Sequence, residues 1–65
     1  MNDKAQLLRR FKNTFRWTNL SLSKAMHVSN VTIHNVLANK NVSYGTMCRL
    51  NEFFEQHEDE VNFLK

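Results

Sequence analysis

The chain of 65 residues contains no proline, one glycine and one cysteine. Proline and glycine most often break or turn the backbone, so their scarcity argues against a β protein with many turns. An apolar content of 42% is enough for one compact core. We therefore predict a single all-α domain over residues 1–65, with four or five short helices. A chain this short buries only about 60% of its unfolded surface.

The lone cysteine, Cys48, has no second cysteine to pair with, which excludes an internal disulfide and a zinc cluster of cysteines. No stretch approaches the roughly 20 apolar residues of a membrane span. The first residues also lack an apolar run of signal-peptide length. We therefore expect a soluble protein of the cytoplasm.

Acidic residues are nearly absent from the first 51 residues, which carry eight Lys or Arg against Asp3 alone, a net charge of +7. Residues 52–65 reverse this balance with a net charge of −4. An almost purely basic body suits a polyanion such as nucleic acid, whereas a mixed surface would serve solubility. Small basic proteins are common, however, and charge alone does not decide the function.

No set of residues in the chain supports catalysis or metal binding. His27, His34 and His57 lack the i, i+3 or i, i+4 spacing of two ligands on one helix. There is no glycine-rich phosphate loop, and no Ser, His and acid set stands out from the scattered surface residues. We therefore predict no catalytic residue, no metal site and no cofactor.

Residues 19–38 are predicted to form two short helices joined by a tight turn. Their apolar residues change register once, between Met26 and Val28, as a bent helix pair requires. The apolar positions on which this interpretation depends are Leu22, Met26, Val28, Ile33 and Val36.

Each of the two helices has a start signal of the same kind. Thr18 precedes the first helix and Ser29 the second, and each side-chain oxygen can accept from the unpaired N–H groups of a first turn. An apolar pair brackets each cap in the hydrophobic-staple arrangement: Trp17 with Leu22, and Val28 with Ile33.

Residues 22–33, LSKAMHVSNVTI, resemble the helix-turn-helix of phage Cro and repressor proteins and their bacterial relatives, the lambda repressor-like family. The family pattern is Leu-Ala-x-x-apolar-Gly-Val-Ser-x-x-x-Ile, and a looser match extends over residues 7–54. The resemblance implies a compact lambda repressor-like domain with its motif at about 19–38. It also implies a DNA-binding regulator that acts in a bacterial cell.

Two residues depart from the family pattern. His27 stands where Gly is usual, at a turn position that requires positive φ, and His accepts this at a cost of about 1 kcal/mol. Leu37 stands where Glu is common, so an ion pair of the family is expected to be absent.

The second motif helix presents the predicted base-reading face. With Val28, Ile33 and Val36 turned inward, the outward side chains are those of Ser29, Asn30, Val31, His34 and Asn35. An Asn can pair bidentately with adenine in the major groove, Val31 can pack on a thymine methyl, and His34 can donate or accept. The alternative is that these are ordinary polar surface residues.

Phosphate contacts are expected on both sides of that helix. The resemblance places a phosphate anchor at Asn19, where the side chain and helix N-terminal amides act together. Lys24 is expected to be exposed nearby, and Lys40, in the loop 39–41, is the strongest single candidate. Gly45 would allow close backbone approach to a phosphate, and Tyr44 either reaches one or lies at the edge of the core.

A first helix is predicted over residues 3–16, with a buried stripe formed by Leu7 or Leu8, Phe11 and Phe15. Four basic residues cover the rest of its surface, and we expect at least one of them to contact phosphate while the others are simply solvated. They are Arg9, Arg10, Lys12 and Arg16.

Ser43 is predicted to cap a later helix whose inward residues are Met47, Leu50 and Phe54. Phe53 and Phe54 cannot both face one small core comfortably. The segment 58–65 is either a helix, with Val61 and Leu64 on one side, or an edge strand. Its surplus of apolar residues, which also includes Phe63, suggests a partner.

We expect a Cro-like transcription regulator that acts by occupying a palindromic operator on double-stranded DNA, as a homodimer held through the segment 58–65. The length leaves no room for an effector domain, so no small-molecule effector is expected. Two rivals remain open: a protein-interaction module, such as an antirepressor or adaptor that binds another regulator, and a DNA-coating protein without sequence preference.

Overall fold

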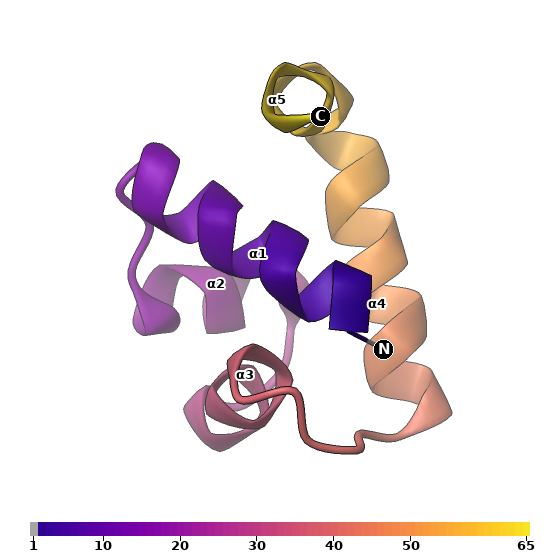
Figure 1. Cartoon of the computed structure of the whole chain (residues 1–65). Coiled ribbons are helices and arrows are strands. Elements are labelled where there is room, and N and C mark those ends of the chain that lie inside the picture. Colours follow the sequence, from indigo (N-terminus) through magenta and orange to yellow (C-terminus); the bar gives the residue numbers. More distant parts are fainter. Residues whose placement is uncertain (1) are drawn as a thin grey trace.

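A computed structural model describes residues 2–65, with side chains from residue 4 onward, and this part of the chain forms five α-helices and no strand (Figure 1). The prediction of an all-α fold with four or five helices is confirmed. The helices are α1 (Asn2–Thr14), α2 (Asn19–Met26), α3 (Asn30–Leu37), α4 (Tyr44–Gln56) and α5 (Glu58–Leu64).

Helices α3 and α5 lie at opposite ends of the molecule (Figure 1). Between them, α1 crosses the middle and contacts both α3 and α5. The second helix packs on α3 and α4, and α5 closes over α1 and α4. This arrangement leaves one side of α3 without a neighbouring helix.

The three predicted helix starts are confirmed by their capping hydrogen bonds. The Thr18 side chain accepts from the Ser21 N–H at 3.0 Å, and the Ser21 hydroxyl accepts from the Thr18 N–H at 2.9 Å, which completes a capping box. Ser29 and Ser43 accept from the N–H three residues further on at 3.1 and 3.2 Å. Each cap satisfies a backbone donor that the first turn leaves unpaired.

One hydrophobic core joins all five helices. Aromatic rings form its centre: Phe11 of α1 lies 5.2 Å from Phe53 and 5.6 Å from Trp17, measured between ring centroids. Trp17, Val28 and Val42, the residues before the three caps, all pack against this core as partly buried side chains. The buried core residues that the sequence pattern singled out are Leu8, Phe11, Leu22, Met26, Ile33, Val36, Leu50, Val61 and Leu64.

The first helix is shorter at its end than predicted. It stops at Thr14, and Arg16 has a φ of 59°, in the left-handed region. That conformation lets the Trp17 N–H return to the Lys12 carbonyl at 2.9 Å, and the chain then turns toward α2. Of the two leucines, Leu8 is fully buried and Leu7 only partly.

The prediction that Phe54 faces inward on α4 missed the better buried phenylalanine: Phe54 packs against the core as a partly buried side chain, while Phe53 lies within it. Phe53 is 1% exposed, whereas Phe54 is only partly buried. The reason is aromatic packing: the Phe53 ring meets Trp17 edge-on at 5.3 Å and lies 4.5 Å from the His57 ring. Phe54 has no comparable set of rings to join.

The segment 58–65 is helical from Glu58 to Leu64, so the structure favours the helix over the edge strand. Val61 and Leu64 are each 6% exposed and belong to the core of this chain, whereas Phe63 is 75% exposed. Two of the three apolar residues expected to contact a partner are therefore used by the fold itself.

The turn between α2 and α3 supports a test of the backbone at His27, whose φ of 58° and ψ of 43° place it in the left-handed region. We predict that the free energy of unfolding of His27→Gly is about 1 kcal/mol higher than that of His27→Ala, because glycine adopts this conformation without strain. The exposed side chain is lost in both variants, so their difference isolates the backbone. Urea denaturation measures it, and equal stability would contradict the assigned strain.

Candidate nucleic-acid interface

The turn between α2 and α3 holds the two helices close together. Ser23 is 6% exposed and its hydroxyl donates to the Leu20 carbonyl at 2.7 Å, so a small polar residue sits at the crossing without an unpaired group. After His27 turns the chain, the Val28 N–H donates to the Ser23 carbonyl at 3.0 Å. These bonds fix where α3 begins relative to α2.

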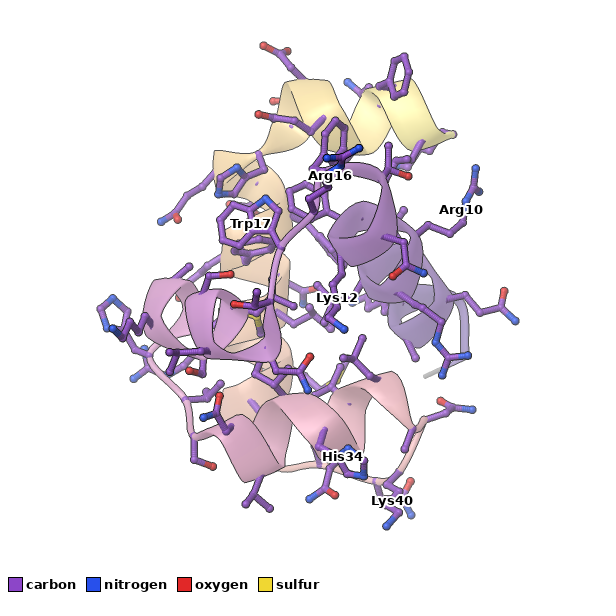
Figure 2. All side chains as sticks on the ribbon, turned by 90° about the vertical axis from the view of Figure 1, so that its left-hand side faces the viewer. Arg10, Lys12, Arg16, Trp17, His34 and Lys40 are labelled. Atoms are coloured by element: carbon purple, nitrogen blue, oxygen red, sulfur yellow. The ribbon has the colours of Figure 1, made fainter. Side chains whose placement is uncertain are left out.

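The outer face of α3 carries exposed side chains with base-reading chemistry. Asn30 and His34 are exposed, and Val31 is 69% exposed although it is apolar. His34 points away from the body of the molecule (Figure 2). The opposite face is fixed by Ile33 and Val36, both 0% exposed. The helix therefore presents an amide, an imidazole and a small apolar group on one side.

Two of the five predicted base-reading side chains are less accessible for contact with a DNA base than the other three. Ser29 is exposed, but its hydroxyl accepts from the Thr32 N–H and lies 2.9 Å from the Thr32 hydroxyl. Asn35 is only partly exposed. Ser29 thus serves first as a helix cap, and Asn30, Val31 and His34 form the freely presented part of the face.

The loop after α3 presents Lys40 at the end of this face (Figure 2). Asn39 has a φ of 60°, and the Lys40 N–H donates to the Asn35 carbonyl at 2.9 Å, which closes the helix end. The Lys40 side chain is exposed. A lysine held at a helix end beside exposed polar residues is well placed for a phosphate.

The first turn of α4 exposes Tyr44 and Gly45. The Tyr44 ring is 85% exposed, so the alternative of a role at the edge of the core is excluded. Hydrogen bonding to the Cys48 side chain raises the pKa of Tyr44. A tyrosine phenol is protonated and able to donate at neutral pH even at its ordinary pKa. A Cβ added to Gly45 would meet only the Ser43 hydroxyl, at 3.9 Å, so the fold does not require a glycine there.

Asn19 and Lys24 lie on α2 as predicted. Lys24 is exposed. Asn19, the first residue of α2, is partly buried, and its Oδ1 atom is buried without a hydrogen-bond partner. A buried carbonyl oxygen without a partner costs about 1–3 kcal/mol and is unusual in a small domain.

Side chains of α1 add a basic group that the sequence pattern did not single out. Lys12 is partly buried and lies between α1 and the helix pair α2–α3, whereas Arg10 points outward (Figure 2). Nothing in the spacing distinguishes Lys12 from its basic neighbours, because only the positions of α2 and α3 relative to α1 set it apart.

Arg9 has a structural role instead. Its guanidinium donates to the carbonyl of Leu37 at the end of α3, across 28 residues of sequence. The family ion pair was expected to be absent because Leu37 replaces Glu. In this chain a bond to the backbone carbonyl ties α1 to α3 at that position, and it places a cation at the negative end of the α3 dipole.

The basic side chains of the interface have no acidic partner among the side chains that the structure describes. Among the side chains described, no Lys or Arg forms an ion pair, and the single acid-to-base contact joins His57 and Glu60 at 4.0 Å. All five acids of residues 52–65 lie on α4 and α5. The helix α5 is at the end of the molecule away from α3 (Figure 1). Lys40 and Arg9, the basic side chains that adjoin the end of α3, therefore have no acidic partner among the described side chains.

Other kinds of site find no support in the part of the chain that the structure describes. There, no three His, Cys, Asp or Glu side chains gather where they could hold a metal ion. No helix over residues 2–65 is both long and apolar enough to cross a membrane.

Comparisons with known proteins identify no relative. No protein-family model, no curated protein and no solved structure matches the chain.

Proposed function

We propose that this protein is a sequence-specific DNA-binding regulator that places α3 in the major groove and acts by occupying its operator. The observation that carries the proposal is the outer face of α3, where Asn30, Val31 and His34 are exposed together on a helix whose other face is fully buried. A helix of this width fits the major groove, and these groups match base edges and thymine methyls.

The surroundings of α3 support the same proposal. Lys40, Lys24 and Tyr44 are exposed on the elements that flank it, and no described Lys or Arg is neutralised by an acid. Phosphate contacts supply most of the affinity for DNA and fix the orientation of the reading helix. The resemblance of residues 22–33 to a lambda repressor-like helix-turn-helix points in the same direction.

Two copies are proposed to occupy one operator. The eight residues of α3 touch only a few base pairs, which is too few to select a site against about 10⁶–10⁹ competitors. Since Val61 and Leu64 belong to the core, the segment 58–65 offers Phe63 alone as an exposed apolar contact. We therefore propose that the symmetry of the DNA brings the copies together.

The function is tested by selecting duplexes that the full chain retains from a random pool, then titrating salt against a selected and a random duplex. We predict a specificity ratio of at least about 10³. The selected sites should be inverted repeats with half-sites about 10–10.5 base pairs apart, so that two α3 helices meet one face of the duplex. Sedimentation should find two copies on the repeat.

Three outcomes would contradict this proposal in different ways. Equal affinity for both duplexes would indicate a DNA-coating protein without sequence preference. Negligible binding to either duplex at low salt would favour the adaptor that binds another regulator. If one copy binds a selected site that has no symmetry, the proposal that two copies share an operator is wrong, while the proposal of base reading stands.

Base reading by Asn30 and Asn35 is tested by replacing each with Ala. We predict a loss of about 1–3 kcal/mol on the selected site and little change on random DNA, because a bidentate amide contact exists only with the correct base. Exposure predicts the larger loss for Asn30, since Asn35 is partly covered. Asn62→Ala, an exposed amide on α5, is the matched control. Equal losses on both duplexes would refute base reading.

Lys40 is predicted to contact a phosphate, which carries no sequence information. Lys40→Ala should weaken binding to every duplex alike and reduce the slope of log K against log salt by about 1. Lys65→Ala removes an exposed lysine from the acidic end of the chain and serves as the control. If the slope of Lys40→Ala equals that of the unaltered protein, Lys40 is only solvated surface.

A further inference from the structure

A cleft lies between α1 and α5, away from the proposed DNA interface. Its volume is about 310 Å³, and it is lined by Phe15, Asp59, Glu60 and Phe63. The two phenylalanine rings lie 6.2 Å apart between centroids at an interplanar angle of 56°. The cleft therefore has an aromatic floor and an acidic rim.

The exposure of Phe63 is not explained by folding. Val61 and Leu64 already hold α5 against the core, each 6% exposed, while Phe63 on the other side of the helix remains 75% exposed. Burying apolar surface is favourable by about 25 cal/mol per Å². The Phe63 ring therefore contributes this free energy only when a partner covers it.

The fold explains the acidic residues of the rim only in part. Glu58, Asp59 and Glu60 occupy the first turn of α5, where negative charge stabilises a helix that has no side-chain cap. Of these, Glu60 is near His57, whereas Asp59 is exposed and has no ion pair among the described residues. Arg16 lies at the same end of α1 (Figure 2), yet residues 52–65 carry a net charge of −4.

We infer that this cleft docks a basic segment of another protein, anchored by one large apolar side chain. Charge decides among the occupants. Nucleic acid and anionic lipid are repelled by the rim, and a second copy would bring the same acids to the contact. A lysine- or arginine-bearing segment pairs with Asp59 and Glu60, while its anchor packs on the Phe15 and Phe63 rings in the open cleft.

The size of the surface also favours a short segment. A stable interface between folded proteins buries about 800 Å² on each partner. One exposed ring and a single cleft fall short of that, but they suit a peptide held by one anchor and flanking charges. Because α3 and α5 lie at opposite ends (Figure 1), the segment and DNA can be bound at the same time.

The inference is tested with the full chain, labelled with ¹⁵N, and a short lysine-rich peptide that carries one central tryptophan. Titration should produce saturable shifts of the amides around Phe15 and in α5, with an affinity that falls as salt is raised. The same peptide with serine in place of tryptophan, and a glutamate-rich peptide that keeps the tryptophan, should each bind at least about tenfold more weakly.

Variants of the protein locate the binding. Phe63→Ser should weaken the peptide at least about tenfold, and Asp59→Asn should reduce the salt dependence, since each removes one of the two interactions. Tyr44→Ser, which removes an aromatic ring that is 85% exposed elsewhere, should leave the peptide affinity unchanged. Phe63→Ser should also leave DNA binding unchanged, which separates this result from that of the proposed function.

Three results would overturn the inference. Shifts spread over the surface without saturation would mean nonspecific charge attraction. Unchanged affinity in Phe63→Ser, with its amide spectrum otherwise intact, would exclude the cleft. Shifts of the Phe15 and Phe63 amides with protein concentration alone, abolished by Phe63→Ser, would assign the surface to a second copy.

Discussion

The contact of Phe11 with the rings around it is the interaction on which the whole arrangement depends. Phe11 is 0% exposed, and its ring meets those of Trp17, Phe53 and His57, with the last centroid at 5.6 Å. These partners come from the segment before α2, from α4 and from the junction between α4 and α5. Aromatic pairs add about 0.5–1.5 kcal/mol each beyond the area they bury. One side chain thus fixes α1 against α4 and against the segments that lead into α2 and α5.

Local signals predicted the beginning of the helices well. Thr18, Ser29 and Ser43 were identified as caps because the preference for a side-chain oxygen arises from the backbone of the first turn itself. The left-handed turn at His27 was predicted differently, from its place in the helix-turn-helix pattern that residues 22–33 resemble. The fold class and the exposed face of α3 follow from such short-range rules together with apolar spacing.

Features that depend on distant neighbours could not be read from the sequence. Phe53 and Phe54 follow Leu50 by three and four residues, so helical spacing accommodates either, and only the positions of Trp17 and His57 favour Phe53 for the core. Lys12 is set apart from its basic neighbours only by the positions of two other helices, α2 and α3 (Figure 2). The bond from Arg9 to a backbone carbonyl is invisible to side-chain patterns, because every residue has that carbonyl.

The two faces of α3 differ in how freely they can change during evolution. Ile33 and Val36 are 0% exposed, and shortening such side chains costs roughly 0.5–5 kcal/mol, a large part of the stability of a small domain. Asn30, Val31 and His34 are exposed, where substitutions usually alter stability by less than about 0.5 kcal/mol. Mutations on that outer face are therefore nearly neutral for folding. A lineage of such proteins can diverge in what the helix recognises while its core sequence stays under constant selection.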